Sequence, residues 1–343
     1  MSPNTVDNHQ PVLVTGCPRS GTTWVGSTIG ASPEVYYFYE PFNNGAPHHL
    51  DFRHRYIFLT EENASTDYPK LEALIKIGHF KGRCKNLFLG WPSWWQLVEE
   101  TVNRVIQDKT IDKKNLSSAK QYSCNPNLWA KKVILKHPSS FFSAKRVLLK
   151  DPLAFFSAPW LAQAFKMKVI VLIRHPAGVI SSHLKLNWDF DFSPLLDQPL
   201  LKQKYLESFE GEIQKVRQEH QTSLAIATLQ WKLFGYITAL YQKQYPDWLF
   251  VRHEDLCKRP ILEFKRIFSY LGMQWTPAIE QKIVSDTGDR NITDLPSPTQ
   301  HALQRNTQRL HQVWKQRLSA SEIAYIKQQL QPVAEQFYAA EDW

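Results

Sequence analysis

Cysteine is scarce in this chain, with four residues among 343. They are widely separated and form no Cys-x-x-Cys pair: Cys17, Cys84, Cys124 and Cys257. Zinc clusters and disulfide-rich scaffolds need closely spaced or numerous cysteines, so this pattern predicts neither of them. Isolated cysteines of this kind are typical of free thiols in a reducing compartment.

Long hydrophobic runs are lacking as well. A membrane-spanning helix needs about 20 consecutive apolar residues, whereas the most apolar stretch, Ser223–Tyr241, is interrupted by Gln230, Lys232 and Gly235. The segment Met1–Gln10 is polar and has no apolar core of the kind found in a signal peptide. The sequence therefore predicts a soluble, cytoplasmic protein without a membrane span.

Acidic residues are outnumbered by basic ones. The chain has 32 Asp and Glu against 41 Lys and Arg, which gives a formal net charge of +9 and a pI near 9.2. This balance favours anionic partners, whether a nucleotide, a polyanionic acceptor or nucleic acid. With 43% hydrophobic and 21% charged residues, the composition is that of a globular protein. We expect a single domain over residues 1–343.

Strand and helix patterns alternate along the chain. Short apolar runs predict five strands, at Pro11–Thr15, Val35–Tyr39, Val147–Lys150, Lys168–Ile173 and Trp248–Arg252. Helical patterns occupy Thr22–Ala31, a stretch ending near Phe165, a stretch beginning at Pro176, Leu200–His220, Gln221–Gln244, Ile261–Leu271 and Ser321–Phe337. This alternation predicts an α/β fold with a P-loop NTPase-like parallel sheet flanked by helices. For residues 43–145 we expect helices and loops that contact an acceptor.

A glycine loop joins the first predicted strand to the first predicted helix. Residues 16–23 read GCPRSGTT, in the strand–loop–helix setting of a P-loop, whose backbone N–H groups bind phosphate. In the motif G-x-x-x-x-G-K-[ST], the lysine contacts the β- and γ-phosphates. Here Thr22 takes that place, and the cation of the loop is Arg19. The loop therefore fits a phosphate, but its charge is placed differently from that of an ATPase.

Residues 18–24, PRSGTTW, resemble the 5′-phosphosulfate loop of sulfotransferases that use 3′-phosphoadenosine 5′-phosphosulfate (PAPS). The resemblance covers about residues 11–338. Aryl sulfotransferases usually carry lysine at the place of Arg19, whereas tyrosylprotein and many carbohydrate sulfotransferases carry arginine. The resemblance implies that the following residues bind the donor, with the tryptophan against the adenine: Arg19, Ser20, Gly21, Thr22, Thr23 and Trp24.

A second motif follows the strand at Lys168–Ile173. Arg174 leaves this strand, and Ser182 lies about two turns into the next helix, so a guanidinium and a hydroxyl could converge on one phosphate. The pair resembles the 3′-phosphate motif of the same family, an arginine followed eight positions later by a serine. Two motifs in the right order and on the right elements are more specific than either motif alone.

Catalytic candidates stand at two further strand ends. Lys150 matches a lysine that helps to hold the sulfuryl group in tyrosylprotein sulfotransferases, and Pro152 stands near the place of the histidine base of aryl enzymes. Glu40, in a Glu-Pro pair, matches the catalytic glutamate of the tyrosylprotein enzymes, so the resemblance makes it the candidate base. Arg19 and Lys150 would neutralise the charge that develops on the bridging oxygen. The next candidates for the base are His48, His49 and His137.

Two segments nearer the C-terminus also resemble parts of the family. The stretch Arg252–Leu256 resembles a strand-end Glu-Asp-Leu segment, which we expect to be structural. The residues Arg305, Arg309 and Trp314 resemble a basic segment that closes over PAPS.

Together these motifs predict a PAPS-dependent sulfotransferase that transfers a sulfuryl group to an acceptor hydroxyl and releases 3′,5′-ADP, without a metal ion. Arg19 and the Glu-Pro pair favour a carbohydrate acceptor. A small-molecule or carrier-bound hydroxyl is the second choice, and a protein tyrosine is the third. We expect no nucleic-acid partner. A P-loop nucleotide kinase, disfavoured by Thr22 at the lysine place, and a non-catalytic protein that binds an acidic polymer are the alternatives from other classes.

Overall fold

A computed structural model describes residues 10–46, 49–84, 146–218, 222–288, 291, 293 and 306–343. Five parallel strands form one sheet in the order β2-β3-β1-β4-β5. Their bounds are β1 Val12–Gly16, β2 Val35–Tyr39, β3 Arg146–Lys150, β4 Lys168–Ile173 and β5 Leu249–Arg252. The predicted α/β fold is therefore confirmed, and the predicted bounds of β2 and β4 agree to the residue. The strand that precedes the glycine loop, β1, lies at the centre of the sheet.

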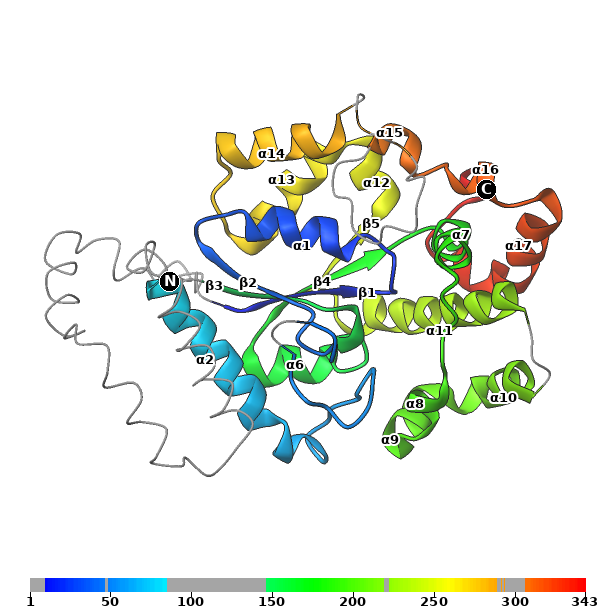
Figure 1. Cartoon of the computed structure of the whole chain (residues 1–343), viewed down its shortest axis with the longest axis horizontal. Helices are drawn as coiled ribbons and strands as arrows, with labels where there is room; N and C mark the ends of the chain where they lie inside the picture. The colour runs from blue at the N-terminus through cyan, green and yellow to red at the C-terminus, as the bar shows by residue number, and fades with distance from the viewer. Residues whose placement is uncertain are drawn as a thin grey trace, which may run out of the picture.

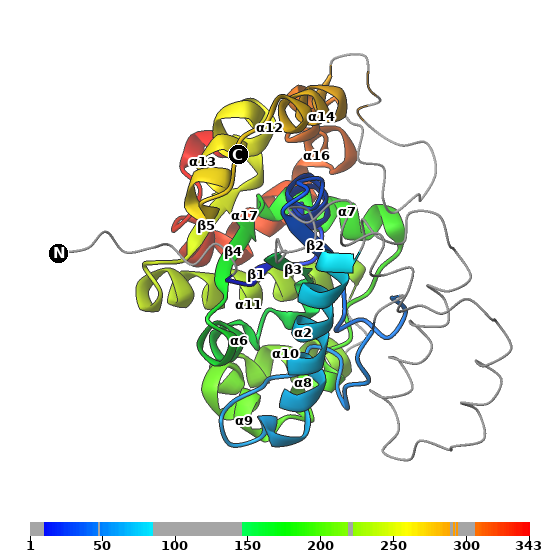
Figure 2. The same ribbon diagram turned by 90° about the vertical axis from the view of Figure 1, so that its left-hand side faces the viewer.

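Helices cover both faces of this sheet (Figure 1), and Figure 2 shows the same layers from the side. One face is covered by α1 Thr22–Gly30, α12 His253–Lys258, α13 Pro260–Leu271 and α14 Pro277–Thr287. The other is covered by α2 Tyr68–Cys84, α6 Ala158–Phe165 and α11 Ser223–Gln244, with α17 Ala320–Ala334 against α11. The other α-helices of the described residues are α7 Pro176–Leu186, α8 Ser193–Leu196, α9 Pro199–Leu201, α10 Glu210–Gln218, α15 Thr307–Leu310 and α16 Trp314–Arg317. In the described ranges, no helix combines the length and apolar character that a membrane crossing requires.

Alternate residues of each strand supply two separate hydrophobic cores. In β4, Val169 and Val171 belong to the core under α6 and α11, whereas Ile170 and Leu172 belong to the core under α1 and α13. Successive side chains of a strand point to opposite faces, so a strand buried on both faces reads as a continuous apolar run. This is why the sequence KVIVLI predicts its strand so clearly.

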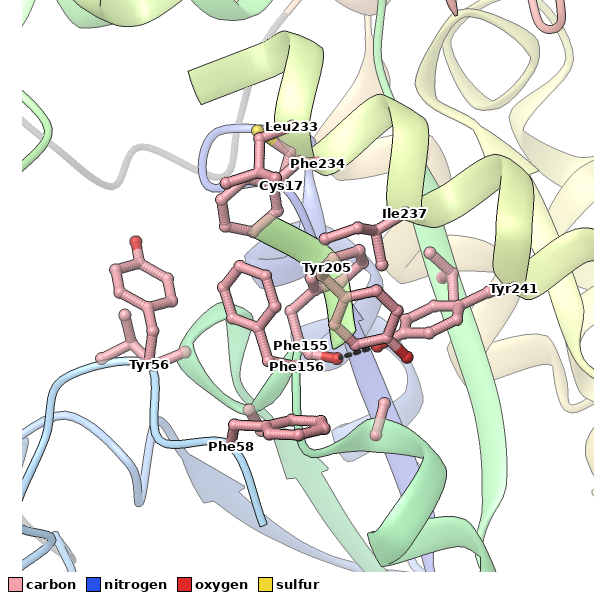
Figure 3. Packing of buried hydrophobic residues seen from close by; sticks show 14 of the residues in the cluster. Cys17, Tyr56, Phe58, Phe155, Phe156, Tyr205, Leu233, Phe234, Ile237 and Tyr241 are labelled. Carbon is pink, nitrogen blue, oxygen red and sulfur yellow. Dashed lines mark hydrogen bonds between the residues drawn. The ribbon is translucent and has the colours of Figure 1, made fainter. Parts of the chain in front are cut away.

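The larger of the two cores is rich in aromatic residues (Figure 3). Phe155 and Phe156, which follow β3, pack against Phe234 of α11 with ring centroids 4.8 and 5.2 Å apart. Further along α11, the hydroxyl of Tyr241 donates a hydrogen bond of 3.2 Å to the carbonyl of Phe155. These contacts fix α11 under the sheet, where its Trp231 indole N–H donates to the carbonyl of Arg174 at the end of β4.

The helical pattern predicted for Leu200–His220 is helical in the structure up to Gln218, but it is not one regular α-helix. The chain instead passes through α9, a π-helical turn at Lys202–Leu206 and a 3₁₀ turn at Glu207–Phe209 before α10 begins. The wide turn holds Tyr205 and Leu206 in the larger core. The predicted helices and loops of 43–145 fall within the description only up to residue 84, and residues 85–145 lie outside it.

Candidate functional site

The glycine loop connects β1 to α1 at the carboxyl edge of the sheet. Gly16 has φ of 142°, and a Cβ there would lie 2.4 Å from the carbonyl oxygen of Leu172. Gly21 has φ of 99°, and a Cβ there would lie 2.7 Å from the His253 ring. Both glycines are therefore required by the backbone path and by close packing. The first N–H groups of α1 have no carbonyl partner within the helix, so they can bind an anion.

The hydroxyl groups of this loop differ in their surroundings. The Ser20 side chain is buried, and its Oγ has no hydrogen-bond partner among the described residues. Thr22 is also buried, whereas Thr23 is partly exposed. A buried hydroxyl without a partner is uncommon in a folded protein, because the lost hydrogen bond to water is not replaced. The loop therefore offers polar groups that a bound phosphate would satisfy.

Arg19 joins the two predicted phosphate motifs. Its Nε donates to the Ser182 Oγ at 3.0 Å, and its own backbone carbonyl accepts from the Arg174 guanidinium at 2.8 Å. Arg19 has φ of 71°, a left-handed conformation that non-glycine residues seldom adopt. The structure thus brings Arg19, Arg174 and Ser182 together, although the sequence separates the first from the others by more than 150 positions.

Arg174, which follows β4, lies in a buried environment close to the Glu254 carboxylate. Desolvation lowers the pKa of Arg174, and the carboxylate of Glu254 opposes this shift. Arg174 Nε is buried without a hydrogen-bond partner among the described residues. The next peptide N–H, that of His175, donates to Glu254 Oε1 at 3.0 Å, and Glu254 Oε2 accepts from the Tyr338 hydroxyl at 2.9 Å. The Glu-Asp-Leu segment therefore supports the strand end, the structural role expected for it.

Glu40 and Lys150 meet at the ends of β2 and β3. These strands are neighbours, and the Glu40 N–H donates to the Lys150 carbonyl at 2.8 Å. The Lys150 ammonium lies 2.5 Å from Glu40 Oε1 and 3.6 Å from the centre of the Tyr39 ring. Glu40 Oε2 accepts from the Asn43 side chain at 2.8 Å. The Lys150 side chain is 0% exposed and that of Glu40 is 15% exposed, so the carboxylate is the member of the pair that faces solvent.

The charge state of Lys150 is set by opposing effects. Burial lowers its pKa, and the Glu40 carboxylate raises it again through charge and a hydrogen bond. The Tyr39 ring adds a cation–π contact, which also favours the ammonium. Burial and the nearby Glu40 charge raise the pKa of Tyr39 to about 12, so its phenol stays protonated. The motif comparison did not select Tyr39 and Asn43, which contact Lys150 and Glu40. Their closeness in sequence to Glu40 is the feature that could have indicated them.

Asp151 fixes the chain that carries Glu40. Its two carboxylate oxygens accept the backbone N–H groups of Phe42 and Leu153, and its carbonyl accepts from the Thr15 hydroxyl at 2.8 Å. Burial raises the pKa of Asp151, while the two backbone N–H donors oppose that shift. The Asp-Pro pair therefore does more than turn the chain, because it ties β1, β3 and the segment after Glu40 together.

Trp24 lies on the side of α1 that faces the second core. It is 8% exposed and packs edge to face against Phe264 and His253, with ring centroids 5.4 and 6.3 Å away. Its predicted contact with adenine stays a prediction. At the C-terminal end, Trp314 stacks on His175 with centroids 4.8 Å apart, one residue from Arg174. Arg309 is an exposed residue of α15.

Some predicted positions lie outside the described residues. These are His48, His137 and Arg305. His49 is exposed, and its ring contacts the carbonyl of Ala46 at 2.9 Å. In the described part of the chain, no group of three or more His, Cys, Asp or Glu side chains is arranged to hold a metal ion.

Comparison with known proteins gives a consistent family. The model of the sulfotransferase family matches residues 11–277. The human protein carbohydrate sulfotransferase 5 is 23% identical over 95% of this chain and 77% of its own length. Among solved structures, the sulfotransferase domain of the Synechococcus PCC 7002 olefin synthase has a TM-score of 0.48 at 18% identity, covering 99% of both chains. The sulfotransferase domain from the curacin biosynthetic pathway has a TM-score of 0.44 at 16% identity, covering 94% of this chain and 98% of its own.

Proposed function

The chain belongs to the sulfotransferase family, and from this premise we propose that it transfers the sulfuryl group of PAPS to a hydroxyl of a carbohydrate. The observation that carries the proposal is the junction of the two phosphate motifs through Arg19. Its side chain reaches Ser182 and its carbonyl binds Arg174. A donor with a 5′-phosphosulfate and a 3′-phosphate needs two anion sites at one edge of the sheet, and the contacts at this junction support their placement there. ATP has no 3′-phosphate to use the second site.

The donor would be held by backbone and side-chain groups of both motifs. The N–H groups at the start of α1, with the Ser20, Thr22 and Thr23 hydroxyls, would bind the 5′-phosphate. Arg174 and Ser182 would bind the 3′-phosphate through charge-assisted hydrogen bonds. The buried Ser20 Oγ and Arg174 Nε, both without partners among the described residues, fit this assignment.

Sulfuryl transfer needs a base for the acceptor and positive charge for the leaving group. The acceptor oxygen forms a bond to sulfur while the bond from sulfur to the bridging phosphate oxygen breaks, and 3′,5′-ADP leaves. Glu40 would take the hydroxyl proton, and Arg19 and Lys150 would neutralise the charge on the bridging oxygen. Because Lys150 contacts Glu40 in the structure, one ammonium can connect the base to the leaving group.

The acceptor class is the finer part of the proposal. A carbohydrate is supported by the matched human carbohydrate sulfotransferase, by Arg19 and by the Glu-Pro pair at Glu40. A small-molecule or carrier-bound hydroxyl, and then a tyrosyl hydroxyl, are the alternatives. The family match and Thr22 at the lysine place both disfavour the kinase. The cytoplasmic location expected from the sequence stays a prediction.

Nucleotide binding tests the donor without knowledge of the acceptor. We expect 3′,5′-ADP to raise the melting temperature in the absence of magnesium, and ATP to have little effect. At a hundredfold excess over the dissociation constant, ligand binding stabilises the native state by about 2.7 kcal/mol. Equal stabilisation by ATP, or an absolute requirement for magnesium, would contradict the proposal and favour the kinase. Incubating the protein with ³⁵S-labelled PAPS and a panel of sugars, alcohols, carrier-bound hydroxyls and tyrosyl peptides then identifies the acceptor.

A further inference from the structure

Trp188 is a large aromatic side chain that lies beside Arg19 and not in the core. The Arg19 guanidinium carbon is 5.5 Å from the centre of the Trp188 ring, a cation–π contact. Trp188 is partly exposed, and among the described residues neither hydrophobic core includes it. Its loop neighbours differ, since Phe192 is buried in the larger core and Phe190 packs against that core. An indole kept at the surface next to a site cation calls for a functional explanation.

The backbone around Trp188 holds the indole in a fixed place. Helix α7 ends at Leu186, and Asn187 follows with φ of 51°, the left-handed conformation common after a helix. The Trp188 N–H then donates to the His183 carbonyl at 3.1 Å. The His183 ring, which is buried, stands edge-on to the indole with centroids 6.2 Å apart. Trp188 is thus anchored on the same helix that carries Ser182.

The loop after Trp188 reaches the part of the chain that follows Glu40. The Phe190 ring lies 5.2 Å from the ring of Tyr56, which is buried and has φ of 58°. The Tyr56 segment returns to the Glu40 region, since Leu50 N–H donates to the Pro41 carbonyl at 2.7 Å. Trp188 therefore contacts the glycine loop at Arg19, and the loop that follows it contacts the segment that continues from Glu40.

We propose that Trp188 is an acceptor subsite that stacks on the C–H face of a pyranose ring. The ring of a pyranoside has one face rich in polarised C–H groups, which matches the negative face of an indole. Arg19 contacts the indole, and Trp188 stays partly exposed beside it. A sugar stacked here lies next to the cation that contacts the leaving group, so one of its hydroxyls can approach the sulfuryl group. This inference rests on the proposed function and names a residue that recognises the acceptor.

Saturation-transfer NMR tests this subsite without turnover. The donor site is first filled with excess 3′,5′-ADP. The probes are the methyl β-glycosides of glucose, galactose and N-acetylglucosamine, and D-sorbitol is the acyclic control. We expect the strongest signal on axial ring protons of at least one glycoside, and little signal on sorbitol. Trp188→Leu keeps apolar bulk but has no flat ring, so the glycoside signal should fall at least fivefold. Trp188→Phe should keep most of it.

Matched controls separate this subsite from folding and from donor binding. Trp275→Ala removes another partly exposed indole, one that packs on Phe268 and donates to Glu280, and it should leave the glycoside signal unchanged. The 3′,5′-ADP melting shift should be the same in all variants. Absence of signal from every glycoside with the wild-type protein, an unchanged signal in Trp188→Leu, or an equal loss in Trp275→Ala would overturn the subsite. Failure of the wild-type protein to bind 3′,5′-ADP would instead overturn the proposed function.

Discussion

Lys150 is the residue that, in our proposal, links the base to the leaving group. Lys150 is fully buried and contacts both the Glu40 carboxylate and the Tyr39 ring. An unpaired ammonium in such a place tends to lose its proton, because burial disfavours the charged form. Burial lowers the pKa of Lys150, and the carboxylate and the ring counter that shift, which favours the charged form that our proposal assigns to it. The pair also keeps Glu40 directed at the carboxyl edge of the sheet, where the acceptor would arrive.

Replacing Glu40 by Gln tests its role as the base. The amide keeps the size, and its single oxygen can still accept from Lys150 or from Asn43, but it cannot take a proton. A positioned base contributes about 10²–10⁴-fold in rate, so we expect kcat to fall by that order and the Kd for 3′,5′-ADP to change little. Sulfate transfer from labelled PAPS and calorimetric titration measure the two quantities. A loss of less than about tenfold would exclude Glu40 as the base and direct attention to His48, His49 and His137.

Arg174 allows the 3′-phosphate contact to be separated from general basicity. A hydrogen bond to a charged group contributes about 1.5–3 kcal/mol, so Arg174→Ala should weaken 3′,5′-ADP about 10- to 150-fold. The affinity for 5′-AMP should hardly change, because that nucleotide lacks the 3′-phosphate. Arg266→Ala, which removes a surface ion pair with Glu263, is the matched control. Equal weakening of both nucleotides would mean that Arg174 supports Arg19 through its carbonyl contact and does not read the 3′-phosphate.

At the scale of elements, the predictable parts are those with strong local signals. The strands β2 and β4 and the start of α7 at Pro176 agree with the sequence prediction to the residue, because buried parallel strands and N-terminal prolines have clear patterns. Helices α12 and α14 were not predicted. The first is a short helix that begins directly after β5, and the second begins at Pro277 beyond the predicted end of the preceding helix. Neither has an apolar pattern long enough to stand out.

The residues of the candidate site also divide into those with a local sequence signal and those without one. Arg19, Arg174 and Ser182 could be selected from motifs, because each motif is a short stretch of sequence. Their contact with one another, and the approach of Lys150 to Glu40, depend on the strand order of the sheet, which no local pattern contains. Trp188 carries no motif at all, so only its position beside Arg19 shows its relevance.

The segment after α17 contacts α12, the helix that follows β5, through a buried hydrogen bond. Tyr338 is 2% exposed, and its hydroxyl donates to the buried Glu254 carboxylate at 2.9 Å. Tyr338→Phe leaves that carboxylate with one donor fewer, so we expect the free energy of unfolding to fall by about 1.5–3 kcal/mol. Tyr325→Phe, on the partly exposed face of α17, should change it by less than about 0.5 kcal/mol. Urea unfolding measures both, and equal effects would contradict a specific role for this bond.

At the scale of the whole molecule, the two cores share one sheet. Every described strand separates the two cores, and β1 and β4 contribute side chains to both of them. If the sheet unfolded, both cores would be exposed to solvent together. This supports our proposal of a single domain. Calorimetry should therefore give one unfolding transition, and 3′,5′-ADP should move it as a unit. Two transitions, with one of them insensitive to 3′,5′-ADP, would divide the chain into separate domains.

Three buried histidines should make the whole fold sensitive to mild acid. His175, His183 and His253 are 2%, 4% and 3% exposed. Burial, with nearby cations, lowers the pKa of His175 to about 3 and that of His183 to about 4, and it holds the pKa of His253 well below its usual value. The unfolded chain takes up these protons near pH 6.5. Because the folded protein does not, stability is present above that pH and is lost as the pH falls towards the folded-state values.

The expected loss can be measured in the absence of nucleotide. Between pH 7 and pH 5.5, each such histidine should lower the free energy of unfolding by about 1 kcal/mol, and the three together by about 3–4 kcal/mol. Urea titrations at the two pH values give this difference. His183→Asn should reduce it by about 1 kcal/mol, whereas the same change at the exposed His49 should leave it unaltered. A free energy of unfolding that does not change over this interval would mean that the folded protein takes up these protons as readily as the unfolded chain. The three histidines would then not be shielded from solvent as the structure shows them.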